Sequence, residues 1–331
     1  MTVTMTTPVV RRTKVGWGDL LWLTWRQHRW LLGGLAAVVA LAVLSCLVMA
    51  WTVDSTGTSR HDFLFLGGFN GATQLVSMLP MAFGGVIAVF WAAPLLAREY
   101  EQKTNVVVWS QDVTPIRWLV GKVVLLGVPA VGLAAALGSA VLTAQHAINS
   151  TTEGYLPFRP FQAESFEAAP LVQIGYAAFG FALGLAAGAI TRRVVLSMGL
   201  TLGLYVVVRG VVGILWRPYF QTPLRQMEPY GVRENSTMWS DPDDLTMRVT
   251  SGYADAAGNE IEFPRDCARS YDTNDGFQNC VRDHGIVNTF RDYQPADRLV
   301  SFQLFEFAVF GLLAAGLLAL TYVWVRRAHR A

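Results

Sequence analysis

The chain has 331 residues, of which 53% are hydrophobic and 15% are charged. Soluble proteins of ordinary composition carry roughly 25% charged residues. This composition therefore excludes an ordinary soluble globule and a disordered chain. The net charge is only +2. The chain contains three cysteines, too few for a disulfide scaffold or a four-thiolate zinc site.

Six apolar segments are each long enough to cross a bilayer, which takes about 20 residues of helix. They cover Trp30–Val53, Leu75–Leu96, Ile116–Ala147, Pro170–Ile190, Val194–Trp216 and Val300–Val325. The fourth and fifth segments are separated only by Thr191, Arg192 and Arg193, which predicts a tight helical hairpin. The sequence therefore predicts an all-α polytopic membrane protein with six transmembrane helices.

Lysine and arginine residues gather on one side of these predicted spans. With the N-terminus in the cytoplasm, the cytoplasmic segments contain Arg11, Arg12, Lys14, Arg26, Arg29, Arg98, Lys103, Arg117, Lys122, Arg192, Arg193, Arg326, Arg327 and Arg330. The two short loops on the other side contain Arg60 and Arg159. Because cytoplasmic loops are enriched in Lys and Arg, we expect a multi-pass protein of the plasma membrane with both termini in the cytoplasm. Contacts with membrane lipid headgroups explain these cations, and nothing in the pattern indicates nucleic acid.

The segment between the fifth and sixth spans is too polar to cross the membrane and too long for a plain connection, which predicts an extracellular domain. Cys267 and Cys280 both lie in it. An oxidising exterior favours a disulfide between them, and two unpaired thiols are the alternative. The expected divisions are residues 1–29 (cytoplasmic, with an interfacial helix), 30–216 (spans 1–5, with an elbow at 97–117), 217–299 (extracellular domain) and 300–331 (span 6 and cytoplasmic C-terminus).

The sequence has no motif typical of catalysis. It contains no G-x-x-x-x-G-K-[ST] phosphate loop, no H-E-x-x-H and no G-x-S-x-G. Its histidines are scattered without the spacing of metal ligands. We therefore expect a non-catalytic protein that needs no cofactor and holds no metal. The alternative of an intramembrane enzyme would require several nucleophilic or ionisable residues at one depth.

The segment after the second span is first polar and then apolar. Glu99 and Lys103 are spaced to pair on a helix, and three valines and Trp109 follow them. Thr114 before Pro115 is typical of a helix N-cap and a first helical residue. The pattern predicts a cytoplasmic helix–turn–helix elbow. Its apolar residues fit either a docking element for a cytoplasmic partner or a helix lying against the headgroups.

The motif A-R-E-x-E-x-x-T, followed by P-x-R-x-x-x-x-K, resembles the permease subunits of type-two ATP-binding-cassette (ABC) exporters. The matching residues are Arg98, Glu99, Glu101, Thr104, Pro115, Arg117 and Lys122. In that family the permease has six spans, and this elbow is the coupling helix that seats on a separate ATPase subunit. The resemblance implies that Glu99–Trp109 meets such an ATPase and that ATP is hydrolysed on the partner chain.

A second stretch, residues 293–306, reads Y-Q-P-A-D-R-L-V-S-F-Q-L-F-E. It resembles the entry to the last span in actinobacterial permeases of this group. The resemblance implies an exporter whose substrate pathway forms between two copies of the chain, or between this chain and a related permease. In the family, spans 2 and 5 line that pathway, which makes Met78, Met81, Phe83 and Tyr205 candidates for the lining. The competing interpretation is a membrane sensor or structural protein that uses the extracellular domain.

Two ionisable residues fall inside the predicted spans. At 1.5 Å per residue, Arg209 lies about 10 Å and Glu306 about 9 Å below the outer edge of the membrane. Charges at membrane depth are usually paired or functional. We hypothesise an Arg209–Glu306 ion pair that fixes helix register or forms part of an outer gate. Direct contact of Arg209 with substrate is the alternative.

Glycines and tryptophans indicate two further features. Glycines recur every four residues at 180, 184 and 188 and again at 199 and 203, which predicts tight helix packing within the chain, with a dimer contact as the alternative. Trp17, Leu21 and Trp25 form an i, i+4 stripe. That stripe predicts a helix over Trp17–Arg29 that lies in the membrane interface before the first span.

Overall fold

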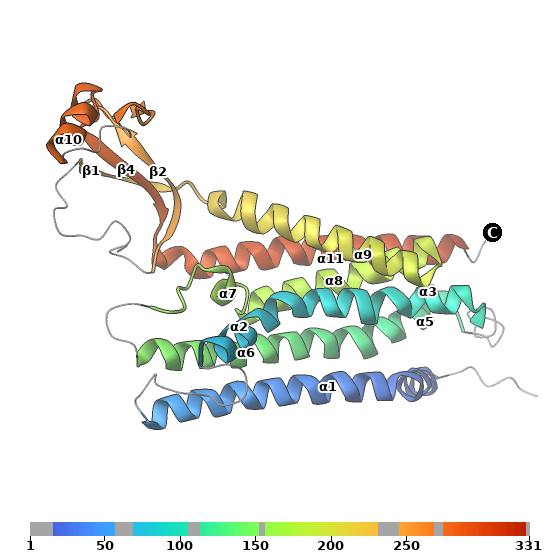
Figure 1. The fold of residues 1–331 in the computed structure, drawn as a ribbon. Coiled ribbons are helices and arrows are strands. Elements are labelled where there is room, and N and C mark those ends of the chain that lie inside the picture. The colour runs from blue at the N-terminus through green and yellow to red at the C-terminus, as the bar shows by residue number, and fades with distance from the viewer. Residues whose placement is uncertain are drawn as a thin grey trace, which may run out of the picture.

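The computed structural model describes residues 16–56, 69–104, 113–151, 156–230, 245–267 and 274–328. Six helical segments long and apolar enough to cross a membrane run side by side, and a small four-stranded sheet stands beyond one end of this bundle (Figure 1). The candidate spans cover 17–55, 77–101, 115–150, 170–191, 194–219 and 296–327. The predicted membrane fold with six helical spans is confirmed, although the first span begins earlier than expected. The four-stranded sheet is a departure from the all-α prediction, because that prediction was drawn from the apolar helices alone.

Three spans contain a stretch of π-helix. The second span runs through α2 (Phe69–Val86), η1 (Ile87–Ala92) and α3 (Ala93–Glu101). The third runs through α5 (Pro115–Lys122), η2 (Val123–Gly127) and α6 (Val128–Ser150). The fifth runs through α9 (Val194–Gly210), η3 (Val211–Trp216) and the short η4 (Arg217–Tyr219). Such wide turns are rare and often mark functional sites.

The first span is one continuous helix, α1 (Trp17–Thr56), with no break before residue 30. At 1.5 Å per residue its length is about 60 Å, which is about twice the thickness of the hydrocarbon core. Figure 1 shows its N-terminal end almost end-on, so this end turns away from the axis of the rest of the helix. Leu20 and Thr24 form its buried face, whereas Trp25 of the predicted stripe is 50% exposed. That the N-terminal turns lie in the membrane interface stays a prediction.

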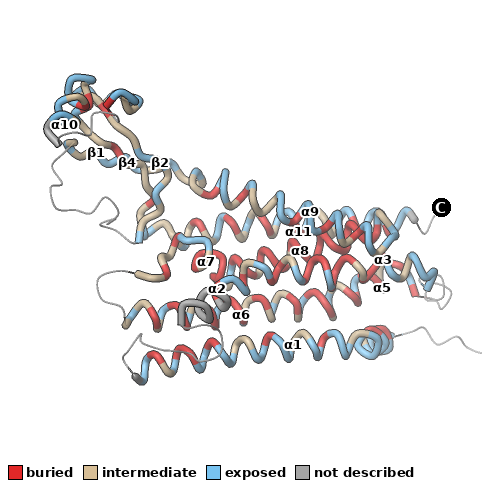
Figure 2. The backbone as a smooth tube through the Cα atoms, viewed as in Figure 1, coloured by how far each residue is buried: buried red, intermediate tan, exposed pale blue. Residues whose placement is uncertain are grey.

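Helix α8 (Pro170–Thr191) lies at the centre of the bundle and is largely buried, whereas α1 and α9 expose much of their surface (Figure 2). A Cβ added at Gly184 would lie 2.6 Å from the carbonyl oxygen of Ala88, and one at Gly188 would lie 2.7 Å from that of Ala93. The predicted close packing is therefore confirmed for α8. It is wrong for Gly199 and Gly203 within the described chain, because nothing lies within 4 Å of a Cβ at either position.

The sheet domain follows the fifth span and returns to the sixth. Its antiparallel strands are ordered β1 (Leu224–Pro229), β4 (Asn288–Gln294), β2 (Met247–Ala254) and β3 (Glu260–Ile261), and α10 (Asn274–Asp283) covers its far end. Arg225 donates to Asp292 at 2.8 Å and to Glu260 at 2.7 Å, which joins β1, β4 and β3. The guanidinium of Arg225 holds the pKa of Asp292 below its ordinary value. After β4, η6 (Ala296–Arg298) leads directly into α11 (Leu299–Ala328).

Candidate functional site

A buried group of four charged side chains and one tyrosine lies at the end of the bundle nearest the sheet. We call it the charge cluster, and it consists of Glu167, Tyr176, Arg209, Arg217 and Glu306. Glu167 precedes α8, Tyr176 lies on α8, and the other three lie on α9, η4 and α11. The cluster therefore joins the fourth, fifth and sixth spans.

The pairing within the charge cluster differs from the prediction. Arg217 donates from Nε to Oε2 of Glu306 at 2.8 Å and from Nη2 to Oε1 at 2.8 Å. Arg209 instead pairs with Glu167. The predicted direct Arg209–Glu306 pair is therefore wrong, because both carboxylate oxygens of Glu306 accept hydrogen bonds from Arg217. Tyr176 completes the network, since its hydroxyl donates to Glu306 and accepts from Arg217 at 3.2 Å.

The π-helix η3 explains why Arg209 and Arg217 face the same way. Eight residues of regular α-helix, at about 100° per residue, would leave the two side chains about 80° apart around the axis. A π-helix turns less per residue because its hydrogen bonds span five residues. Residues 211–216 adopt this wider turn. The wider turn therefore brings both guanidinium groups to the same side of the helix, where both pair with Glu167.

The charge cluster is neutral as a whole and tightly enclosed. It contains two arginines and two glutamates, and Glu306 is 1% exposed. Arg209 lies over the ring of Tyr176 at 4.0 Å, and Arg217 lies over the ring of Phe166 at 4.3 Å. Charges removed from water are tolerated only when they are paired and hydrogen-bonded. The cluster satisfies this condition, so it can hold three spans in one register.

Side chains near the charge cluster also reach the backbone of α2. Arg209 donates to the carbonyl oxygen of Met81, and Gln173 of α8 donates to that of Pro80 at 2.9 Å. Gln173 donates as well to the carbonyl of Glu167, and Gln145 of α6 donates to that of Glu164 in α7 (Ala163–Phe166). Buried glutamines thus satisfy the irregular backbone that α7 introduces beside the spans.

The four predicted lining residues do not share one surface. Tyr205 is 3% exposed and stacks on Phe179 at 5.8 Å, and its ring fills the space over Gly84 and Gly85. Phe83 is buried as well. Met81 is half-buried beside Arg209, and only Met78 is strongly exposed, at 45%. The prediction that all four line one pathway is wrong for Phe83 and Tyr205, which fill the protein interior.

At the opposite end of the bundle, the elbow is held by a buried ion pair. Lys122 of α5, which is 1% exposed, pairs with Glu99 of α3. The expected pairing of Glu99 with Lys103 is wrong, because α3 ends at Glu101 and Lys103 beyond it has a left-handed φ of 56. Lys122 also lies over the ring of Trp118 at 5.1 Å. Glu99 and Lys122 therefore fix the two arms of the elbow to each other and do not face outwards.

The elbow is also tied to the α8–α9 hairpin. The carboxylate of Glu101 accepts from the backbone N–H of Val194 at 3.1 Å, at the N-terminus of α9. A carboxylate is favoured there because it satisfies a free amide and faces the positive end of the helix dipole. The guanidinium of Arg192 lies over the ring of Tyr100 at 5.2 Å, and Ser197 donates to Ala93 at 3.2 Å. These contacts therefore connect α3 directly to the hairpin.

The second arm of the elbow contacts α1. Thr114 caps α5 by accepting from the N–H of Arg117 at 3.3 Å, and Pro115 follows as the first helical residue, as predicted. The guanidinium of Arg117 lies over the ring of Trp17 at 4.9 Å. Arg98, Glu101 and Thr104 are exposed on the same end, and Trp109 lies outside the described residues.

Sequence reasoning missed Glu167, Tyr176 and Arg217. Glu167 comes just before the fourth predicted span, and Arg217 is the first residue of the predicted extracellular domain, so neither falls inside a predicted span. Tyr176 was one aromatic residue among many in an apolar helix. The signal that could have found them is charge balance, because a buried arginine needs an acidic partner and the flanks of neighbouring spans offer one.

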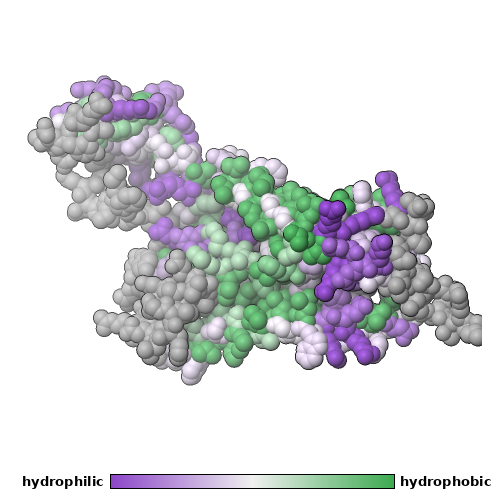
Figure 3. Space-filling model, turned by 45° about the vertical axis from the view of Figure 1, so that its right-hand side comes forward, coloured by the Kyte–Doolittle hydropathy of each residue, from purple (hydrophilic) through white to green (hydrophobic). Residues whose placement is uncertain are grey.

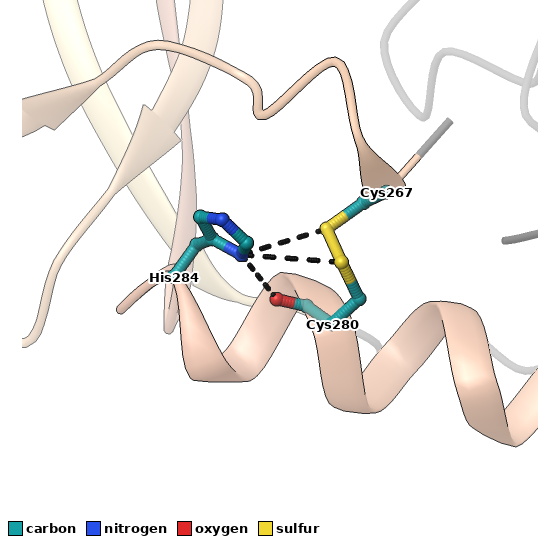
Figure 4. Close-up of a disulfide and its surroundings, with 3 residues drawn as sticks. All are labelled: Cys267, Cys280 and His284. Atoms are coloured by element: carbon teal, nitrogen blue, oxygen red, sulfur yellow. Dashed lines mark hydrogen bonds between the residues drawn. A yellow bond between two sulfur atoms is a disulfide. The ribbon is translucent and has the colours of Figure 1, made fainter. Parts of the chain in front are cut away.

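Cys267 and Cys280 form a disulfide in the sheet domain. His284 lies beside it, with its imidazole turned towards both sulfur atoms (Figure 4). Among the described residues, these three side chains make a group with the spacing of metal ligands. While both sulfur atoms are bonded to each other, they cannot act as thiolate ligands.

A family model described as ABC-2 membrane transporter related matches residues 32–217. The match runs from the first span to the end of the fifth, and it includes the elbow, the α8–α9 hairpin and four members of the charge cluster. Comparison with curated proteins gave no match, and comparison with solved structures gave none either.

Proposed function

The chain belongs to the ABC-2 membrane transporter related family, and we propose that it is the membrane-spanning subunit of an ATP-driven exporter. It is not itself the ATPase; a separate ABC ATPase subunit supplies the energy. Two copies of the chain, or this chain and a related permease, form the pathway with two ATPase subunits. The family match over residues 32–217 is the single observation that carries this proposal.

The proposed orientation puts the elbow in the cytoplasm of a cell whose plasma membrane the protein crosses. On the face that Figure 3 shows, apolar side chains cover the bundle, and hydrophilic side chains lie beyond them at the elbow end. Exposed arginines at that end include Arg26, Arg98, Arg192, Arg193, Arg326 and Arg327. Cytoplasmic faces carry this excess of cations. Both termini are then cytoplasmic, and the sheet domain is extracellular.

The contacts of the elbow support a coupling role. We propose that the ATPase docks against the exposed surface around Arg98, Glu101 and Thr104 and against the chain that continues to Trp109, which lies outside the described residues. Glu101 and Tyr100 would pass the motion of the ATPase to the α8–α9 hairpin, and the Glu99–Lys122 pair would pass it to α5. The connected spans would then move together, and this movement would carry the substrate across the membrane.

The charge cluster supports a role as the outer gate of the same pathway. It joins α8, η4 and α11 under the sheet domain, and Arg209 contacts the backbone of α2. The sheet domain is anchored at the same place, because Gln294 of β4 donates to the carbonyls of Pro218 at 3.0 Å and Gln221 at 2.7 Å. We propose that the spans on this side separate only when these contacts rearrange.

The test is co-purification with an ABC ATPase subunit, followed by measurement of ATP hydrolysis in proteoliposomes. Glu101→Arg places a cation at the N-terminus of α9, and we expect it to uncouple hydrolysis from transport without preventing membrane insertion. Arg265→Glu is the matched control, because Arg265 is exposed on the sheet domain at the other end. Equal transport by both variants, or transport by the chain without any ATPase, would overturn the proposal.

A further inference from the structure

The sheet domain brings two cysteines and a histidine to one point. The sulfur atoms of Cys267 and Cys280 and a ring nitrogen of His284 all lie within 4.8 Å of one another (Figure 4). We propose that reduction of the Cys267–Cys280 disulfide converts this point into a binding site for one thiophilic divalent metal ion, and that Zn²⁺ is the ion it fits. The inference concerns the sheet domain alone and does not depend on the transport function.

The positions of the ligand atoms support this site. In a tetrahedral zinc site with Zn–S near 2.3 Å and Zn–N near 2.0–2.1 Å, a nitrogen and a sulfur ligand lie about 3.6 Å apart, and two sulfur ligands lie about 3.8 Å apart. Nδ1 of His284 lies 3.6 Å from Sγ of Cys267 and 3.9 Å from Sγ of Cys280. The two nitrogen–sulfur separations are therefore already close to those of a tetrahedral zinc site.

The largest change needed is the separation of the two sulfur atoms, and the imidazole of His284 must follow them. The Cα atoms of Cys267 and Cys280 lie 5.6 Å apart. At that distance, rotation of the two side chains can move the sulfur atoms from a covalent bond to the spacing of two zinc ligands. Cys280 and His284 are four residues apart at the end of α10, so the helix geometry holds them on one face.

His284 can turn to a metal at low cost. Its Nδ1 now donates to the carbonyl oxygen of Cys280 at 2.8 Å. The same carbonyl also accepts from the backbone N–H of His284 at 3.2 Å, so it keeps a partner when Nδ1 leaves. Gly285, the next residue, has a φ of 80, and glycine adopts this left-handed conformation without strain. His284 is exposed, which leaves the fourth metal position open to water.

The chemistry balances with a dithiol as the reductant. The dithiol transfers two electrons and two protons to the Cys267–Cys280 bond and becomes a cyclic disulfide, and two thiols are left on the protein. Binding of M²⁺ then releases two thiol protons to solvent, and the ring proton of His284 moves from Nδ1 to Nε2. Two thiolates, one neutral imidazole and a water molecule surround the metal, and the charge of the ion is neutralised.

The site would replace one cross-link with another. The core beneath α10 is small, and its fully enclosed residues are Cys267, Val281 and Ile286. Small cores of this kind depend on disulfides or metals for stability. A bound Zn²⁺ would hold α10 against the segment before Cys267 after the disulfide opens, so the sheet domain would stay folded in either redox state.

The experiment uses the full chain in detergent, purified through a tag without histidines. The background is Cys46→Ala, which removes the buried free thiol of α1. The protein is reduced with dithiothreitol, freed of reductant under argon and titrated with Co²⁺. We expect a thiolate-to-cobalt charge-transfer band at one equivalent per chain, displaced by Zn²⁺ and absent from the oxidised protein.

Matched variants separate this site from incidental binding. His284→Gln is expected to weaken metal binding by about tenfold or more, since even outer-shell changes at metal sites cost about 10–100-fold. His146→Gln, in α6, is expected to change nothing. Equal cobalt uptake by the oxidised and reduced protein, or by the two histidine variants, would overturn the proposal.

Limited proteolysis of the sheet domain gives a readout that does not rely on metal spectra. Reduction is expected to speed cleavage, and Zn²⁺ is expected to return the rate to that of the oxidised protein in the parent but not in His284→Gln. The oxidised variant serves as the folding check, because its disulfide is intact. If Zn²⁺ gives no protection to the reduced parent, the site does not form.

Discussion

Neutralising Glu306 is expected to be among the most destabilising changes in the membrane part of the protein. Glu306 is 1% exposed and accepts two N–H bonds from Arg217, each at 2.8 Å. In Glu306→Gln, the nearest carboxylate to Arg217 is that of Glu167 at 3.3 Å, and the neutral cluster gains one positive charge. Two charge-assisted hydrogen bonds contribute about 1.5–3 kcal/mol each. Removal of one partner of a buried pair costs about 3–5 kcal/mol, so we expect a loss of about 4 kcal/mol.

A double-mutant cycle measures the pairing directly. The free energy of unfolding of Glu306→Gln, Arg217→Gln and the double variant is measured by denaturant titration in mixed micelles. The double variant is neutral again, so it should lose less than the sum of the single variants, with a coupling near the upper end of the usual range of about 0.5–3 kcal/mol. In a parallel cycle with Arg209→Gln the coupling to Glu306 should be smaller, because Arg209 pairs with Glu167. A larger coupling for Arg209 than for Arg217 would refute this account of the cluster.

Three further predictions test the packing, the elbow and the sheet domain. Gly184→Ala should lower the free energy of unfolding by about 1–3 kcal/mol, because the new Cβ meets the backbone of α3 and η1. The control Gly203→Ala should change the free energy of unfolding by less than about 0.5 kcal/mol. Equal melting temperatures for the two variants in detergent would contradict the close packing at Gly184. Glu99→Gln leaves a buried lysine without its carboxylate and should reduce the folded yield in membranes, and a second substitution that neutralises the lysine should restore it; a yield equal to that of the parent would show that the pair is dispensable. Arg225 lowers the pKa of Asp292 in the folded state, so their pairing stabilises the sheet domain at any pH above the ordinary carboxyl pKa, and this stabilisation is lost as the pH falls through the lowered pKa. In Arg225→Gln, the resistance of the sheet domain to pepsin should therefore fall less steeply as the pH is lowered. Identical pH profiles for the variant and the parent would argue against the pair.

The layout of the protein could be predicted from local sequence. Long apolar runs identify the spans because a helix must satisfy its own backbone in lipid. Thr114 and Pro115 predicted the start of α5, and the glycines at 180, 184 and 188 predicted the close contacts of α8. Each of these signals depends on neighbours within a few residues along the chain.

The partners of the buried charges could not be predicted in the same way. Equal depth in the membrane made Arg209 and Glu306 a plausible pair, but depth says nothing about rotation around a helix axis. The π-helix η3 changed that rotation and brought Arg217 to Glu306. Likewise, spacing made Glu99 and Lys103 neighbours on a helix, whereas α3 ends before Lys103 and Glu99 pairs with Lys122, 23 positions along the chain.

Taken alone, the sequence determined that this chain crosses the membrane six times, which end carries its cations, and where the elbow lies. These properties follow from hydropathy, charge and capping, which act over one helix or one turn. Only the tertiary structure decided which charges neutralise each other, which aromatic residues fill the interior, and that the elbow is fixed to the α8–α9 hairpin. Those contacts join residues far apart in the chain, and a buried charge takes the partner that the packed helices bring within reach.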